Sequence, residues 1–225
     1  MPDRSVDAVL FDMDGVLCDS EPLICEAARQ MFRERYGVDL DPEEFRPFVG
    51  AGEDRYLGGP AERRGLRLNL PPDKARTYEI YLELIRGRLR PLPGAVGFVR
   101  ACRQLGLRTA VATSADRIKL DGNLREIGLE PDEFDAKITG DEIRRKKPDP
   151  EIFLTAAAAL NVPPSRCLVV EDAPNGLRAG VAAGARCLGI LSSFSEAELR
   201  AAGARWVARN LAEARPFLPA MIAAT

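Results

Sequence analysis

The sequence predicts an α/β protein with a Rossmann-like, three-layer α/β/α parallel-sheet core and an inserted α-helical cap domain. Two observations predict this fold class. From Pro91 onward, short apolar stretches alternate with amphipathic ones, a pattern typical of a parallel sheet covered by helices on both faces. Between the first apolar strand and Pro91 the spacing is helical and arginine is frequent. We therefore expect this helical segment to interrupt the sheet-forming sequence as a cap.

The first strand is expected in the stretch VLFDMDGVL, which begins at Val9. Residues i and i+2 of an extended strand share a face, so Asp12 and Asp14 would crowd unless the chain turned between them. Gly15 permits such a turn. If the strand ends at Asp12, the two carboxylates converge where a divalent cation or a phosphate could use them. A surface turn with solvated acids is the alternative.

The expected core comprises residues 1–18 and 91–225, and the expected cap comprises residues 19–90. Inside the cap, apolar residues recur at helical spacing in 24–32 and 78–85. The chain would pass between the two domains through linkers at 18–22 and 91–94.

Five further strands are expected after the second linker, at residues 107–112, 136–139, 167–170, 186–191 and 206–208. Amphipathic stretches at 95–104 and 151–160 would form two of the intervening helices. The second follows Pro148-Asp149-Pro150, which is typical of a helix start.

The composition of the chain excludes several kinds of catalytic and metal site. The chain has 225 residues, a net charge of -2 and no histidine. The absence of histidine removes Ser-His and Cys-His nucleophile schemes and histidine-ligated metals. The five cysteines form no C-x-x-C pair, so we interpret them as reduced intracellular thiols and not as a disulfide framework or zinc site. Acid–base work would fall to carboxylates, lysine or tyrosine.

The expected partners follow from the same features. No basic run indicates nucleic-acid binding, and no apolar stretch approaches the roughly 20 residues that cross a bilayer. The start of the chain does not resemble a secretory signal. We expect a soluble, cytoplasmic monomer that neither binds nucleic acid nor inserts into a membrane.

Polar residues gather where the expected strands end, which is the edge at which open α/β sheets bind ligands. They are Asp12, then Thr113 and Ser114, then Lys147 in a nearby loop, then Glu171 and Asp172. Taken singly, each has a plain explanation as a helix cap, a solvated charge or a loop acid. Their joint appearance in this order favours one site.

The chemistry that suits this set is phosphoryl transfer. A carboxylate at Asp12 can attack phosphorus and become an aspartyl phosphate, while Asp14 protonates the leaving oxygen and later deprotonates water. Asp12 and Asp172 offer oxygen ligands to Mg²⁺. The Thr113 hydroxyl and the Lys147 ammonium would bind the phosphoryl oxygens.

Four stretches, DMDGVLCDSEP, ATSAD, KKPDPEIF and VVEDAPNG, resemble the motifs of the haloacid dehalogenase-like hydrolase superfamily. The resemblance implies Asp12 as nucleophile, Asp14 as general acid/base that also gives its carbonyl to Mg²⁺, Thr113 as the phosphate-binding hydroxyl and Lys147 as the charge-stabilising lysine.

It also implies two further Mg²⁺ ligands: Asp172 as the second carboxylate, and Glu171 as an outer ligand that acts through water or directly. We expect Ser114 to contact the substrate, and we interpret the neighbouring Lys146 as solvated.

Within the superfamily the chain is similar to β-phosphoglucomutase and to phosphoglycolate phosphatase, both of which have an α-helical cap. The mutase has a cap histidine where this chain has Ile24, counted from Asp19, and a cap arginine near the place of Glu53. Hydrolysis of a sugar phosphate or a phosphoglycolate-like ester is therefore favoured. A phosphomutase and a low-turnover regulatory domain that binds phosphorylated ligands stay open as alternatives.

The cap loop FVGAGEDRYLGG and the run SADRIKLDGNL also resemble the corresponding domain of the chloroplast suppressor-of-quenching proteins, so a stromal location is a second expectation. We expect Gly50, Glu53 and Arg55 of this cap loop to meet the non-phosphate part of the substrate, because a closing lid completes such a site.

Overall fold

The structure is a computed structural model that describes residues 5–223, so the ends of the expected core, 1–4 and 224–225, lie outside it. Within that range a six-stranded sheet has the order β3-β2-β1-β4-β5-β6, and all neighbouring strands are parallel. The strands are β1 (Ala8–Phe11), β2 (Arg108–Ala112), β3 (Ala136–Ile138), β4 (Cys167–Glu171), β5 (Arg186–Ile190) and β6 (Trp206–Ala208). The expected α/β class and all six expected strands are confirmed.

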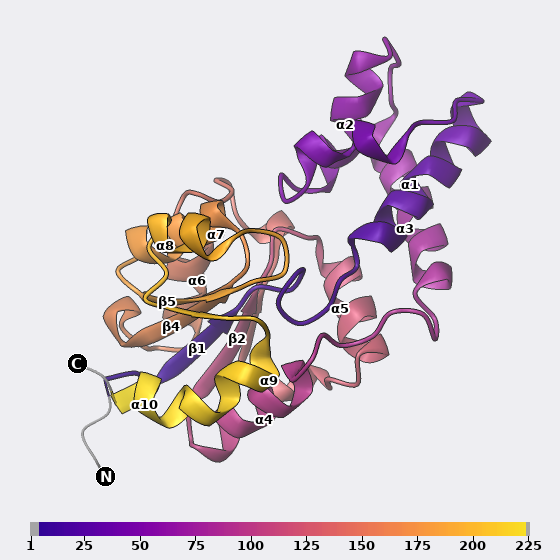
Figure 1. Cartoon of the computed structure of the whole chain (residues 1–225). Coiled ribbons are helices and arrows are strands. Elements are labelled where there is room, and N and C mark those ends of the chain that lie inside the picture. Colours follow the sequence, from indigo (N-terminus) through magenta and orange to yellow (C-terminus); the bar gives the residue numbers. More distant parts are fainter. Residues whose placement is uncertain (1–4, 224–225) are drawn as a thin grey trace.

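Helices cover both faces of this sheet (Figure 1). The two faces of β1 show why three layers form. Val9 and Phe11 pack into one buried cluster with Phe98 of α4 (Ala95–Gln104), whereas Ala8 and Leu10 pack into a second cluster with Phe153 of α6 (Glu151–Ala159). A strand that is buried on both sides carries apolar residues at every position, as β1 does.

The remaining core helices are α5 (Arg117–Glu126), α7 (Pro174–Ala182), α8 (Glu196–Ala201), α9 (Leu211–Ala214) and α10 (Leu218–Ala223). Short 3₁₀ turns occur at η1 (Pro42–Glu44), η2 (Arg46–Phe48), η3 (Pro131–Glu133), η4 (Gly140–Glu142), η5 (Pro164–Arg166) and η6 (Arg215–Phe217).

Three helices between β1 and β2 stand apart from the sheet: α1 (Glu21–Tyr36), α2 (Glu53–Arg63) and α3 (Leu70–Leu84) (Figure 1). The two chain segments that join them to the core lie side by side, because Cys18 pairs with Pro91 as an isolated antiparallel bridge and Leu92 N–H donates to the Leu17 carbonyl at 2.9 Å. We propose that residues 19–90 form the cap and that this paired crossing is its hinge.

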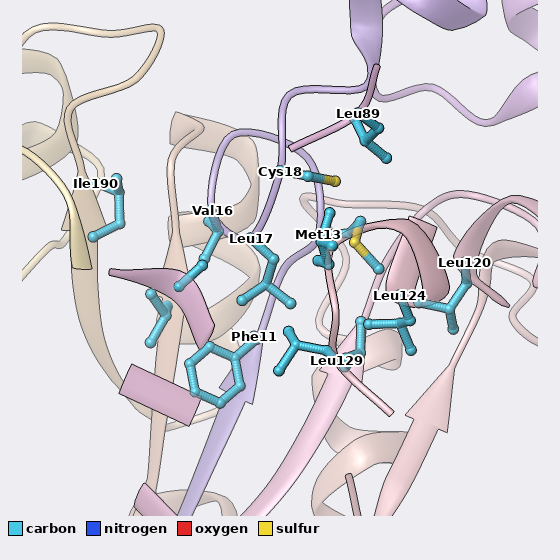
Figure 2. Close-up of a cluster of buried hydrophobic side chains, with 14 of the residues drawn as sticks. Phe11, Met13, Val16, Leu17, Cys18, Leu89, Leu120, Leu124, Leu129 and Ile190 are labelled. Carbon is cyan, nitrogen blue, oxygen red and sulfur yellow. The ribbon is translucent and has the colours of Figure 1, made fainter. Parts of the chain in front are cut away.

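The segment after β1 is held by its own apolar residues. Met13, Leu17 and Cys18 are fully buried, and Figure 2 shows them in one cluster with Leu120 and Leu124 of α5. Gly15 adopts a φ of 77°, and its N–H donates to the Cys18 carbonyl at 2.8 Å. The chain therefore turns just after Asp14, and the burial of Met13 in this cluster leaves Asp12 and Asp14 at the edge of the sheet.

Candidate active site

A cavity of about 1170 Å³ lies at the carboxyl ends of the strands, between the sheet and helices α1 and α2. Core residues that line it are Asp12, Asp14, Thr113, Ser114, Lys147, Glu171 and Asp172; Gly50 and Glu53 line it from the other side. Nine of the ten positions that the sequence indicated as a site thus border one space. Arg55 does not border it.

Lys147 is the centre of the charged cluster at the sheet edge. Its ammonium donates to Asp12 Oδ1 at 2.5 Å, to Glu171 Oε1 at 2.6 Å and to the Ala112 carbonyl at 3.2 Å. Burial disfavours the ammonium, but Asp12 and Glu171 outweigh it, so the pKa of Lys147 is raised and the side chain stays charged. Burial also raises the pKa of Asp12, against the opposing effect of Lys147. One cation thus faces two carboxylates.

A third carboxylate completes an acidic group. Oxygens of Asp12, Glu171 and Asp172 lie within 4.8 Å of one another, and all three residues are buried. Burial first, and the nearby Glu171 second, raise the pKa of Asp172 to about 7. Lys147 alone does not balance three such acids, and oxygen ligands of this kind suit a hard cation such as Mg²⁺.

Two neighbours shape this group further. Ser192 Oγ donates to Asp172 Oδ2 at 2.8 Å. A Cβ on Gly15 would lie 2.1 Å from the same oxygen, so only glycine leaves room for the carboxylate there. The residues present therefore fit a divalent cation, which Asp12, Asp172 and Glu171 could hold.

Thr113 and Ser114 follow β2 directly. Thr113 is buried, its N–H donates to the Ile138 carbonyl at 3.0 Å, and its Oγ1 accepts from Ala115 N–H at 3.1 Å. The hydroxyl proton of Thr113 is left for another acceptor, as a phosphate-binding hydroxyl requires. The prediction that Lys146 is solvated is wrong, because its ammonium donates to the Gly140 carbonyl and the side chain is half-buried.

Asp14 has two partners that sequence reasoning missed. Ser20 Oγ donates to Asp14 Oδ1, and Lys119 Nζ donates to Asp14 Oδ2 at 3.0 Å. Lys119 lies in α5, is 4% exposed and lines the cavity. No local motif indicates Lys119. The one signal in the sequence is its place next to Leu120, an apolar residue that the structure buries.

The cap positions behave differently from one another. Glu53 is the first residue of α2 and is 8% exposed, and burial raises its pKa to about 7 although Lys119 opposes the shift. Arg55 donates instead to Glu62 Oε2 at 2.7 Å and stacks over the Phe48 ring, with its side chain half exposed. The structure thus leaves Arg55 outside the cavity, and the cap arginine that borders it is Arg46.

The parallel sheet with a helical insertion, and the carboxylates and lysine at its strand ends, are the features of a class of phosphoric monoester hydrolases. The chain belongs to the haloacid dehalogenase-like hydrolase family, whose profile matches residues 6–184. The expected family is thereby confirmed.

Similar proteins cover most of this chain. It is 46% identical over 202 residues to the Arabidopsis thaliana protein SUPPRESSOR OF QUENCHING 1, chloroplastic, a match that spans 88% of this chain but 19% of that protein. It is 35% identical over 195 residues to a phosphorylated carbohydrates phosphatase of Thermotoga maritima, a match that spans 85% of this chain and 88% of the relative. The resemblance to suppressor-of-quenching proteins is confirmed.

Among solved structures, a CbbY mutant from Rhodobacter sphaeroides in complex with xylulose-(1,5)bisphosphate superposes with a TM-score of 0.81 at 30% identity, over 92% of this chain and 96% of that one. Within residues 5–223, none of the helices combines the length and apolarity that a membrane crossing requires.

Proposed function

We propose that this protein is a Mg²⁺-dependent phosphatase that hydrolyses a small phosphorylated metabolite, a sugar phosphate or a phosphoglycolate-like ester, through an aspartyl-phosphate intermediate. One observation carries the proposal. Asp12 lies at the end of the central strand, paired with Lys147 at 2.5 Å and grouped with two further buried carboxylates in a cavity large enough for a metabolite.

In the first step an Asp12 oxygen forms a bond to phosphorus while the bond from phosphorus to the ester oxygen breaks. Asp14 gives its proton to that leaving oxygen. In the second step water attacks the phosphorus of the aspartyl phosphate, Asp14 takes the water proton, and the Asp12 carboxylate is released with inorganic phosphate. Both steps balance without a histidine.

The surrounding side chains would neutralise the charge of the phosphoryl group and orient Asp14. The Lys147 ammonium and the Thr113 hydroxyl face the transferred phosphoryl group, where negative charge spreads over the oxygens. Mg²⁺, held by Asp12, Asp172 and the Asp14 carbonyl with Glu171 behind, would supply further neutralisation of that charge. Ser20 and Lys119 hold both Asp14 oxygens, which limits the directions in which Asp14 can deliver a proton.

Two relatives support a carbohydrate phosphate as substrate: one is named a phosphorylated carbohydrates phosphatase, and the other was solved with a sugar bisphosphate. Hydrolysis is favoured over phosphomutase activity because Ile24, an apolar residue, borders the cavity at the position of the mutase histidine. That the protein is a monomer and cytoplasmic or stromal stays a prediction.

The test is phosphate release with Mg²⁺ from p-nitrophenyl phosphate, a panel of sugar phosphates and phosphoglycolate. Asp12→Asn removes the nucleophile at nearly constant shape, and Asp132→Asn, an exposed position outside the cavity, is the matched control. We expect turnover in the wild type and in Asp132→Asn and none in Asp12→Asn. Equal release from all three proteins, or none from any, would contradict the proposal and favour the regulatory alternative.

A further inference from the structure

The cap side of the cavity contains a buried carboxylate, Glu53, of which one oxygen has no hydrogen-bond partner among the described residues. Glu53 Oε1 lies 3.8 Å from Lys119 Nζ, whereas Glu53 Oε2 has no hydrogen-bond partner among the residues that the structure describes. Glu53 is the first residue of α2 and borders the cavity. A residue that lines the substrate space thus carries a buried carboxylate oxygen without a partner among the described residues.

Unpaired buried oxygens are rare in folded proteins because each one has given up water without a replacement. A ligand that donates hydrogen bonds at this place would satisfy Glu53 Oε2. A ligand that brings another anion offers no proton to this oxygen and is repelled by the ionised form of Glu53. The unpaired oxygen therefore indicates a hydroxyl-bearing ligand.

Lys119 links Glu53 to the proposed acid/base, Asp14. Lys119 contacts Asp14, the proposed acid/base, at 3.0 Å and faces Glu53 at 3.8 Å. Asp14 is the proposed proton donor to the ester oxygen. A substrate group bound by Glu53 would therefore lie near that oxygen, since the Lys119 ammonium contacts Asp14 and is close to Glu53. A hydroxyl on one of the first few carbons after the ester fits this position.

The charges on the cap side of the cavity also favour a hydroxyl over an anionic group as the ligand of Glu53. Asp14, Glu53 and the half-buried Glu21 border the cavity together with one buried cation, Lys119. Arg46 also borders the cavity, but its side chain is 79% exposed and pairs with Glu43. The negative side chains outnumber the buried cation, which disfavours a second phosphate or a carboxylate beside Glu53.

We infer that Glu53 is a specificity-determining residue whose free oxygen accepts a hydrogen bond from a substrate hydroxyl near the ester, so that the preferred substrates are monophosphates of sugars or other polyols. This inference rests on the proposed phosphatase function. It separates the two substrate classes left open there, because phosphoglycolate carries a carboxylate and no hydroxyl at that place.

The test pairs substrates with variants. Glu53→Met removes the acceptor at similar size, Glu53→Gln keeps an acceptor without the charge, and Glu62→Gln on the exposed side of α2 is the matched control. The values of kcat/KM are measured for the best sugar monophosphate of the panel, for its analogues lacking one hydroxyl each, for a sugar bisphosphate and for p-nitrophenyl phosphate, which has no such hydroxyl. Thermal melts confirm that each variant folds.

We expect Glu53→Met to lower kcat/KM for the sugar monophosphate about 10- to 100-fold more than for p-nitrophenyl phosphate, as for a lost hydrogen bond to a charged group. Glu53→Gln should recover part of that difference, and Glu62→Gln should match the wild type. In the wild type, one deoxy analogue should show the same loss, and Glu53→Met should add little to it, since both changes remove one contact.

Three results would overturn the inference: equal losses for all substrates in Glu53→Met, a bisphosphate preferred to every monophosphate, or no deoxy analogue whose loss is shared with the variant. Failure of the phosphatase proposal looks different, because then no substrate, including p-nitrophenyl phosphate, is hydrolysed by the wild type. In that event calorimetric titration of wild type and Glu53→Met with the sugar monophosphates decides the inference: weaker binding by the variant supports it, and equal binding overturns it.

Discussion

Lys119 Nζ lies 3.0 Å from Asp14 Oδ2, although 105 residues separate them. The ammonium is buried; burial alone would favour its neutral form, but Asp14 and Glu53 outweigh this and raise the pKa of Lys119. The lysine therefore stays charged and joins the proposed acid/base to a cap residue. In a chain without histidine, this lysine is the cation that offsets the Asp14 charge.

Lys119→Met should lower kcat about 10- to 100-fold and change KM less, because Asp14 would lose the partner that orients it while the phosphate-binding groups stay in place. A tenfold loss corresponds to about 1.4 kcal/mol of transition-state stabilisation. The measurement is steady-state kinetics on the best substrate, with Lys137→Met outside the cavity as control. A rise in KM at constant kcat would assign Lys119 to substrate binding alone.

Gly15→Ala should lower kcat/KM at least tenfold and raise the Mg²⁺ concentration needed for half-maximal activity. The added Cβ would lie 2.1 Å from Asp172 Oδ2, so the carboxylate must move. Gly37→Ala is the control: Gly37 has a similar φ of 67° but no atom within 4 Å of the added Cβ. Both variants should lose about 1–2 kcal/mol of stability from the left-handed backbone, and only the first should lose activity. Equal activities would show that the Asp172 position is not needed.

Mg²⁺ should raise the melting temperature of the wild type, and a chelator should abolish turnover. A cation at 100 times its dissociation constant adds about 2.7 kcal/mol to the free energy of unfolding. Asp172→Asn should lose most of this shift, and Asp132→Asn should keep it. Because burial and Glu171 raise the pKa of Asp172 to about 7, protons compete with the cation, and the shift should shrink as the pH falls from 8 to 5. A pH-independent or absent shift in the wild type would contradict the metal site.

The free energy of unfolding of Glu53→Gln, relative to that of the wild type, should be higher at pH 8 than at pH 5. The folded protein holds the pKa of Glu53 at about 7, above its ordinary 4.5, so between these values the folded state binds more protons than the unfolded state. The free energy of unfolding of the wild type therefore falls as the pH rises through this window, by on the order of 3 kcal/mol from this residue. Urea unfolding of wild type, Glu53→Gln and Glu62→Gln at both pH values measures the difference. No difference between the Glu53 variant and the wild type would place Glu53 in contact with water.

The sequence predicted the fold well because its strands and their ends are local features. β1 and β4 are apolar at nearly every position, as buried parallel strands must be, and polar residues follow both. The first strand ends one residue earlier than expected, at Phe11, although Asp12 N–H still donates to the Val170 carbonyl at 2.9 Å. Since parallel strands end at one edge, the meeting of Asp12 with Asp172 followed from topology.

The sequence by itself determined the sheet, its order of motifs and the acids and lysine at its edge, because these depend on periodicity and on residues adjacent to strands. The tertiary structure alone decided how the insertion meets that edge. It brought Lys119 to Asp14, placed Glu53 inside the cavity and turned Arg55 outward to Glu62. Such contacts join segments far apart in the chain, and which face of a helix meets them depends on packing between helices, which local spacing does not encode.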